Sequence, residues 1–329
     1  MKVAILGTGA MGTIFGVALA RSGAQLVCYD VRADVIDAIR ENGLRLSGIS
    51  GEHCLSVPAH TRPEDLGTVD LALVLVDSSA TAQAAEVAAR CLSPEGYALT
   101  LQNGIGNLEA LVARLGAGRV AAGITYNSGA GLAPGHARHT NAGHTVMGEA
   151  GGPISQRLRQ LAARFEAGGI PITLSDAVEG HIWSKFVHNC AINPISALTA
   201  LRPGEIWSDP AARQLIERVI DEILAVVQAA GIHLPEHDPR AEILEHCRIR
   251  YNRPSMLQHR LAGRTTEIGA LNEALIKRAR DLRIATPVNE TIVLAIRAMQ
   301  ASNGGRDREL DEAALEAAAL HGQAPHTSG

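Results

Sequence analysis

Short apolar runs alternate with segments of helical periodicity along the first half of the chain. The runs MKVAIL, AQLVCYD, LALVLVD and GYALTLQNG are each followed by a stretch in which apolar residues recur every three or four positions. LALVLVD (residues 71–77) is apolar almost throughout, which is typical of a central strand in a parallel sheet. Residues 118–174 add shorter predicted strands and a helix near 153–167. Strands and helices in this alternation predict βαβ units and a doubly wound parallel sheet.

The pattern changes near residue 176, beyond which strand-like runs no longer occur. Apolar residues then recur at helical spacing in the segments 177–200, 210–231, 237–250, 267–284, 288–302 and 308–320. We therefore expect an α/β protein with an N-terminal Rossmann domain and a C-terminal all-helical domain. The predicted boundaries are 1–172 for the dinucleotide-binding domain, 173–305 for the helical substrate and catalytic domain, and 306–329 for a terminal helix and a disordered tail.

Composition and charge exclude several classes of protein. Hydrophobic residues make up 46% of the 329 residues, and 30 Lys and Arg stand against 34 Asp and Glu, a net charge of −4. A disordered chain would be less apolar, and a nucleic-acid-binding protein would carry a basic surplus. The glycine-rich start is unlike a signal peptide or membrane span, and five cysteines without a CxxC pair indicate free thiols in a reducing compartment. We therefore expect a cytoplasmic protein without a nucleic-acid or membrane partner.

A glycine fingerprint lies between the first predicted strand and the first predicted helix. Its residues are Gly7, Thr8, Gly9, Ala10, Met11 and Gly12. In a dinucleotide-binding turn the first glycine makes the tight turn, the second lets the pyrophosphate approach the backbone, and the third lets the helix pack on the strand. The helix N-terminus then offers N–H groups to the phosphates. The sequence therefore predicts an NAD(P)H site at this turn.

Two further positions belong to the predicted cofactor edge. Asp30 ends the second predicted strand, where an acidic residue accepts hydrogen bonds from the ribose hydroxyls of NAD, although Arg32 could instead reach a 2′-phosphate. Asp30 also reads as a turn residue at a strand end. Asn103, in LQNGIGN, follows another strand at the edge where ligands sit, and Asn103-Gly104 also reads as a plain turn. These alternatives stay open from the residues alone.

The segment Ile182–Pro194 in the helical half carries the signal for chemistry. Lys185, Asn189 and Asn193 are spaced by four, so on a helix they drift only about 40° per step and line one face. That face is either a functional stripe or a solvated surface. Pro194 places Asn193 either at a helix kink or at the N-cap of a new helix. Lysine is rare in this chain, because three of its 30 basic residues are lysine and 27 are arginine. Arginine is a poor acid, so Lys185 is informative as a proton donor.

Five motifs taken together resemble the ketopantoate reductases (2-dehydropantoate 2-reductases). They are GTGAMG, LQNGIGN, WSKFVHNCAINPISALT, NRPSMLQHRLAGRTTEI and ATPVNE, and they occur in the family's order over residues 1–300. The resemblance implies a Rossmann domain joined to a helical domain similar to those of the 6-phosphogluconate dehydrogenase superfamily. It also implies NAD(P)H-dependent reduction of a 2-oxo acid to a 2-hydroxy acid, above all of 2-dehydropantoate to pantoate in pantothenate biosynthesis.

The resemblance also implies roles for single residues. Lys185 matches the family's general acid, and Glu267 matches an acidic residue that helps to bind substrate and organise the site. Asn103 matches a residue that links the nicotinamide side to the catalytic lysine. Residues matching those that hold the substrate's hydroxyl and carboxylate are Asn189, Asn193, Asn252 and Ser255. Without the resemblance, Glu267 reads as an acid in the first turn of a capped helix, and Asn252 and Ser255 as caps at a helix start.

The chain departs from the family at the cofactor edge. Asp77 stands where members usually carry a lysine, and Asp30 where a basic residue is common, which favours NADH over NADPH because carboxylates repel a 2′-phosphate. The alternatives are a dehydrogenase of the same fold that acts on a different 2-hydroxy or sugar acid with NAD, and a non-catalytic nucleotide-binding sensor. The histidines lack metal-ligand spacing, so no metal is expected. The apolar helices of the second domain are compatible with a homodimer.

Overall fold

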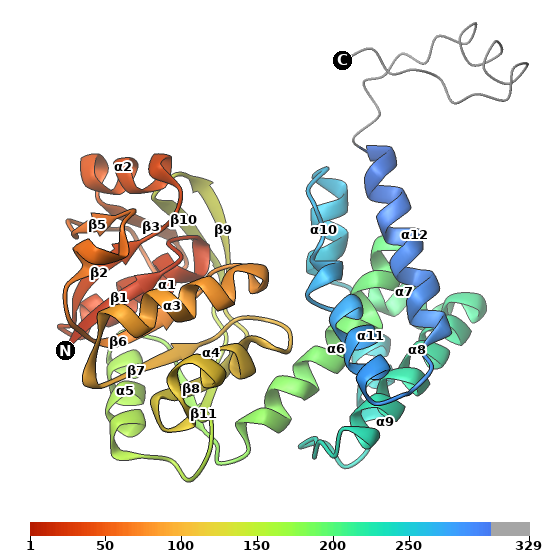
Figure 1. Cartoon of the computed structure of the whole chain (residues 1–329). Helices are drawn as coiled ribbons and strands as arrows, with labels where there is room; N and C mark the ends of the chain where they lie inside the picture. The colour runs from red at the N-terminus through yellow and green to blue at the C-terminus, as the bar shows by residue number, and fades with distance from the viewer. Residues whose placement is uncertain (304–329) are drawn as a thin grey trace, which may run out of the picture.

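The computed structural model describes residues 1–303, which form two bodies joined by one long helix (Figure 1). The sheet-containing body holds the N-terminal half, and the helical body holds the C-terminal half. The segment 306–329, with the helix expected at 308–320, lies outside the described residues. The expected fold class, a Rossmann domain followed by an all-helical domain, is confirmed.

Within residues 1–303 the main sheet has eight strands in the order β12-β11-β8-β7-β6-β1-β2-β5. All neighbours pair in parallel except β11 and β8. The strands are β1 (Lys2–Leu6), β2 (Gln25–Tyr29), β5 (Ala59–His60), β6 (Val69–Val74), β7 (Leu92–Thr100), β8 (Val120–Thr125), β11 (Thr145–Glu149) and β12 (Ile172–Leu174). The chain order reverses beside β1, and ligands of such sheets bind at the carboxyl ends of the strands at this point.

Helices cover both faces of the main sheet, as continuous apolar strands require. On one face α1 (Ala10–Arg21) and α5 (Gln156–Ala167) pack together, with Phe15 and Phe165 in edge-to-face contact at 5.4 Å. The other face carries α3 (Thr81–Cys91) and α4 (Asn107–Leu115). All four helices lie at positions predicted from their apolar periodicity. The two cores hold the ends of β1, β2, β6 and β7 in fixed positions.

A second sheet, which the sequence pattern did not predict, packs beside α1 and α2 (Ala33–Asn42). Among the described residues its strand order is β4-β3-β10-β9, formed by Leu44–Gly48 (β3), His53–Leu55 (β4), Ser128–Ala133 (β9) and His136–Asn141 (β10). Its strands are short, and several of their side chains are polar, so no apolar run marks them. The 3-10 turns η1 (Pro63–Leu66), η2 (Ser78–Ala80) and η3 (Ala117–Arg119) complete this body.

The helical body is built around α6 (Val178–Thr199), which begins beside the sheet and runs into the second body (Figure 1). The other helices are α7 (Pro203–Ser208), α8 (Pro210–Ala229), α9 (Pro239–Ile249), α10 (Ser255–Leu261), α11 (Asn272–Asp281) and α12 (Pro287–Asn303). The short helices α7 and α10 were not predicted from the sequence pattern. The helix expected from 267 begins instead at 272, after the 3-10 turn η4 (Glu267–Gly269).

Pro194 lies inside α6, so the alternative that Asn193 caps a new helix is wrong. A proline lacks the N–H that would bond the carbonyl four residues earlier, which here is that of Cys190. The buried side chain of Asn272 in α11 donates to this carbonyl at 3.0 Å. The amide of Asn272 therefore supplies the donor that the proline removes, and the helix continues past it.

Two further expectations concern the whole chain. All five cysteines, which fall within the described residues, are free thiols, and four of them are buried. This confirms the expectation of unpaired cysteines. Among the described helices, none combines the length and the apolar character that crossing a membrane requires.

Candidate active site

The fingerprint loop has the geometry of a dinucleotide cradle. Gly7 has a φ of 94°, and a Cβ there would lie 2.8 Å from the backbone of Leu75 at the end of β6. A Cβ on Gly12 would lie 2.0 Å from the carbonyl oxygen of Gly7. At Gly9, by contrast, no atom of the described residues comes within 4 Å of such a Cβ. Gly7 and Gly12 are therefore needed for packing, whereas Gly9 leaves open space before the N-terminus of α1 at Ala10 and Met11.

Asp30 is held against this loop by hydrogen bonds. The amide and the hydroxyl of Thr8 donate to Asp30 Oδ2 at 3.0 and 3.1 Å, and the amide of Arg32 donates to Oδ1 at 3.1 Å. The guanidinium of Arg32 pairs with Asp34 instead, at 2.6 and 3.2 Å. Asp77 is exposed on the segment after β6, which packs on Gly7 through Leu75 and Val76. Acidic side chains therefore stand on both strand ends that flank the loop.

Lys185 lies on the side of α6 that faces the sheet-containing body. Its Nζ donates to the carbonyl oxygen of Thr125, at the end of β8, at 2.5 Å. Burial lowers the pKa of Lys185 to about 8, while the nearby carboxylate of Glu267 acts in the opposite direction. The amine therefore points into the junction of the two bodies, and it is set to exchange a proton near neutral pH.

Glu267, Ser255 and Asn193 form a chain of side chains on the helical body. The amide of Asn193 donates to Ser255 Oγ, and this hydroxyl donates to Glu267 Oε2, both at 3.4 Å. Asn193 is buried, while Ser255 is exposed at the first residue of α10. The hydroxyl of Ser255 thus faces Glu267, and Pro254 takes the N-cap position of α10. The structure brings these three predicted site residues together and links them to Lys185 through the charge of Glu267.

The side chains of the other predicted site residues make fewer contacts with the rest of the site. Asn189 is half-buried on α6 between Lys185 and Asn193, and Asn252 is exposed just before α10. Asn103 is exposed, and its carbonyl accepts hydrogen bonds from Ser78 Oγ at 3.1 Å and Asn107 Nδ2 at 3.0 Å. The side-chain amides of Asn189, Asn252 and Asn103 form no hydrogen bond with another described residue.

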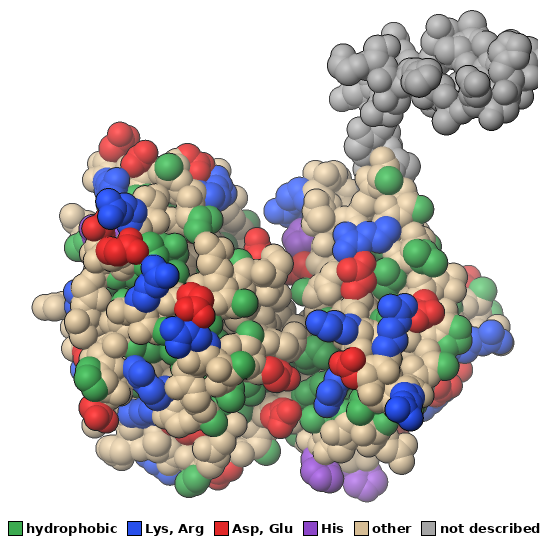
Figure 2. Space-filling model, viewed as in Figure 1, with side chains coloured by type: hydrophobic (Ala, Val, Ile, Leu, Met, Phe, Trp, Pro, Cys, Tyr) green, Lys and Arg blue, Asp and Glu red, His purple; other side chains and the backbone are tan. Residues whose placement is uncertain are grey.

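The loop of Asn103 touches the helical body directly. Gly104 has a φ of 89°, and a Cβ there would lie 2.7 Å from the carbonyl oxygen of Ala270. Ala270 follows the turn that carries Glu267. The backbones of the two bodies therefore meet beside the predicted site, and the space-filling view shows a groove between the bodies on the face in view (Figure 2).

Tyr126 also belongs to the surroundings of Lys185, and the sequence analysis missed it. The Lys185 Nζ lies 5.4 Å from the centroid of its ring. The available signal was an aromatic residue directly after the predicted strand VAAGIT, in a chain with only 3% aromatic residues. That signal alone does not distinguish a site residue from an ordinary strand end.

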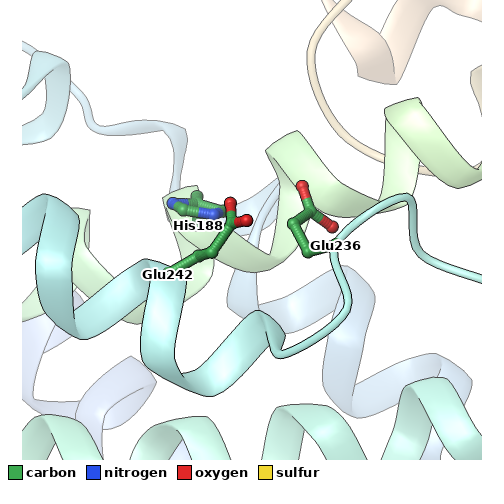
Figure 3. Close-up of side chains that lie close together, drawn as sticks. All are labelled: His188, Glu236 and Glu242. Atoms are coloured by element: carbon green, nitrogen blue, oxygen red, sulfur yellow. The ribbon is translucent and has the colours of Figure 1, made fainter.

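Three side chains near α6 have atoms that metals bind. One ligand atom each of His188, Glu236 and Glu242 lies within 4.8 Å of the others (Figure 3). Glu236 also accepts a hydrogen bond from Ser184, and Glu242 is exposed. These residues come from α6, the segment before α9 and α9 itself, so sequence spacing could not group them. The expectation that this protein binds no metal stays a prediction.

Two family models match the chain. The model described as "Ketopantoate reductase PanE/ApbA" matches residues 3–152, and the model described as "Ketopantoate reductase PanE/ApbA C terminal" matches residues 177–300. A 2-dehydropantoate 2-reductase of Halobacterium salinarum is 31% identical over 301 residues, covering 91% of this chain and 99% of the relative. One from Aquifex aeolicus is 30% identical over 315 residues, covering 92% and 98%. The similarity therefore spans both bodies.

Solved structures are also similar to this chain over most of its length. A PanE/ApbA family ketopantoate reductase from Ralstonia eutropha superposes with a TM-score of 0.81 at 32% identity, covering 92% of this chain and 100% of that one. A D-mandelate dehydrogenase solved with NADH and anilino(oxo)acetate also has a TM-score of 0.81, at 23% identity and with coverage of 92% and 99%. At 23% identity, the similarity to D-mandelate dehydrogenase supports the fold alone.

Proposed function

The chain belongs to the ketopantoate reductase family, and from this premise we propose that it reduces 2-dehydropantoate to pantoate with a nicotinamide cofactor. The observation that carries the proposal is the position of the Lys185 amine, which points from the helical body to the end of β8. Reduction of a ketone leaves an alkoxide, which needs a proton donor and a positive neighbour. An ammonium group supplies both.

The residues of the fingerprint loop fit the cofactor. Open space above Gly9, the N-terminus of α1 and the carboxylate of Asp30 match the needs of pyrophosphate and ribose. Asn103 belongs to the same edge, at the carboxyl end of β7. When bound, a reduced nicotinamide supplies the hydride. The chain itself has to hold the 2-oxo acid and deliver the proton.

Proton delivery falls to Lys185. Its Nζ gives a proton to the substrate's carbonyl oxygen as that oxygen gains negative charge, and the depressed pKa of the amine makes this transfer easier. The charge of Glu267 raises the pKa of the amine and so favours its protonated form. In this proposal the side chains of Asn189, Asn193, Asn252 and Ser255 bind the carboxylate and hydroxyl of the substrate. The hydrogen bonds from Asn193 through Ser255 to Glu267 orient Asn193 and Ser255.

The proposal includes a preference for NADH over NADPH. Asp30 stands at the end of β2, where Rossmann proteins meet the ribose, and Thr8 fixes its carboxylate. Arg32, the residue able to bind a 2′-phosphate, is paired with Asp34. Asp77 adds a second carboxylate beside the loop. A negatively charged 2′-phosphate would therefore meet repulsion, and the guanidinium of Arg32 is engaged by Asp34.

A spectrophotometric screen tests these statements. Oxidation of NADH and of NADPH is followed with 2-dehydropantoate and related 2-oxo acids, and kcat/KM is compared for the two cofactors. Turnover of 2-dehydropantoate with NADH at least as efficient as with NADPH is expected. A hundredfold preference for NADPH would contradict the cofactor assignment. Turnover of another 2-oxo acid alone would move the protein to a different substrate, and cofactor binding without any turnover would make it a nucleotide sensor.

A homodimer in a reducing compartment such as the cytoplasm completes the proposal. The helical body exposes the apolar side chains of Ile249, Tyr251, Leu261 and Leu294. Such side chains gain from burial against a second copy. Light scattering on the purified protein measures its mass in solution, and a monomer at micromolar concentration would rule the dimer out.

A further inference from the structure

Tyr126 is an exposed aromatic residue whose position is fixed by its backbone. Its amide donates to the carbonyl of His144 at 3.0 Å, and its carbonyl accepts from Asn141 Nδ2 at 2.9 Å. The backbone of Gly143 packs so closely that a Cβ there would lie 2.5 Å from Tyr126. The ring stacks on that of His144, with the centroids 4.6 Å apart. An aromatic ring held in this way is preorganised for contact with a ligand.

The ring borders the catalytic amine. Lys185 Nζ bonds the carbonyl of Thr125, the residue before Tyr126, and lies 5.4 Å from the ring centroid. The amine and the ring are therefore neighbours at the end of β8. A ketone oxygen that accepts a proton from Lys185 brings the carbon chain of its 2-oxo acid close to this ring.

The contacts of the fold leave part of the ring uncovered. Tyr126 is 42% exposed, so much of its aromatic surface stays in contact with water. The chain has only 4 Tyr, 3 Phe and 2 Trp, and most of its core is aliphatic. Burial and the charge of Glu236 raise the pKa of the Tyr126 phenol above its usual value. The side chain thus presents an uncharged, partly apolar surface beside the site.

We propose that Tyr126 determines substrate specificity by forming the wall against which the side chain of the 2-oxo acid packs. This inference rests on the proposed function. A branched or aromatic group next to the ketone removes apolar surface of the ring from water, whereas a methyl group gains little from it. The substrate class is therefore 2-oxo acids with a bulky apolar or aromatic group beside the carbonyl, in preference to small ones such as pyruvate.

The test compares substrates within each variant. For the wild type, Tyr126→Phe and Tyr126→Ala, kcat/KM is measured with 2-dehydropantoate, benzoylformate and pyruvate at saturating cofactor. The ratio of a bulky acid to pyruvate cancels changes at Lys185, since both substrates need the same proton. Tyr126→Ala should lower this ratio about tenfold, and Tyr126→Phe, which keeps the ring, should stay within about twofold of the wild type.

An unchanged ratio in Tyr126→Ala would overturn the inference, and so would a Tyr126→Phe variant as impaired as the alanine variant. Binding of the same acids to the protein with oxidised cofactor (NAD⁺), which has no hydride to give, is followed by calorimetry and measures the selectivity without turnover. A wild type that reduces none of the acids would overturn the proposed function, and the binding ratio would still decide the role of Tyr126. Circular dichroism of each variant checks that the fold is intact.

Discussion

Lys185 differs from its basic neighbours in being able to release a proton. Arginine has a pKa above about 12 and makes a poor acid, and 27 of the 30 basic residues here are arginine. Replacing Lys185 by Ala should lower kcat by at least about 10²-fold, the usual scale for a lost general acid. The proposed cofactor contacts lie on the other body, so NADH affinity should stay nearly the same. Steady-state kinetics and fluorescence titration with NADH measure the two quantities.

The matched control is Lys185→Arg, which keeps the positive charge and removes the acidity. If proton donation is the main contribution, the arginine variant should be nearly as slow as the alanine variant. If the charge alone stabilises the alkoxide, arginine should restore most of kcat. A Lys185→Ala variant with wild-type kcat would remove the residue from the mechanism.

The pH profile follows from the same amine. Burial lowers the pKa of Lys185 to about 8, and a general acid acts in its protonated form. The rate of reduction should therefore be level at about pH 7 and below, decline around pH 8, and fall about tenfold per pH unit well above it. The measurement is kcat for the 2-oxo acid between pH 6 and 10. A profile in Lys185→Arg that keeps the same alkaline limb would assign the limb to another group.

Single residues were predictable where chemistry restricts the residue type. The spacing of Lys185, Asn189 and Asn193 placed them on one face of a helix, and the resemblance added Glu267 and Ser255. The chain from Asn193 to Glu267 is a tertiary arrangement, so its hydrogen bonds could not be read from spacing. Tyr126 was not predicted, because no local pattern marks a residue by its distance from Lys185 on the other body.

At the scale of elements, α6 depends on a residue far along the chain. Asn272 in α11 donates to the Cys190 carbonyl left free by Pro194, and it also donates to Asn289 Oδ1 at 2.8 Å. The amide of Asn289 in turn donates to Glu222 in α8 at 2.7 Å. This buried network ties α6, which carries the predicted site, to three other helices.

Replacing Asn272 by Ala should therefore destabilise the protein by about 1–3 kcal/mol, because a buried carbonyl loses its partner. In a Pro194→Ala background the new N–H can bond Cys190 within the helix, so the same replacement should cost about 1 kcal/mol less. The bond to Asn289 is lost in both backgrounds and cancels. Urea unfolding of the four proteins in this double-mutant cycle measures the difference. Equal costs in the two backgrounds would show that Asn272 does not compensate for the proline.

Elements were predictable where one period persists long enough. The buried runs of β1, β2, β6 and β7 and the long helices α6, α8 and α12 lie where apolar spacing put them. Short elements could not be predicted, because they are stabilised by the elements that pack beside them. HARHTN forms β10 because β3 and β9 pair with it, and PGEIWS forms α7 in only six residues.

At the scale of the whole molecule, the site depends on how the two bodies meet. Lys185 bonds β8, and Gly104 touches Ala270, so each body contributes a contact to the other. The sequence predicts both bodies and a set of candidate site residues on each of them. It could not predict these contacts, because they arise from the relative placement of two domains whose own patterns are independent.

Gly104 and Gly106 allow this junction to be tested at two positions of similar positive φ. Their φ values are 89° and 90°, so alanine costs about 1–2 kcal/mol at either position. A Cβ at Gly104 would also lie 2.7 Å from the Ala270 carbonyl, whereas at Gly106 no described atom lies within 4 Å. Gly104→Ala must therefore shift its own loop or the turn bearing Glu267, and it should lower kcat/KM at least about tenfold. Gly106→Ala, which has the positive φ without this close contact, should keep kcat/KM within about twofold. Equal activities in the two variants would mean that catalysis does not depend on this contact between the bodies.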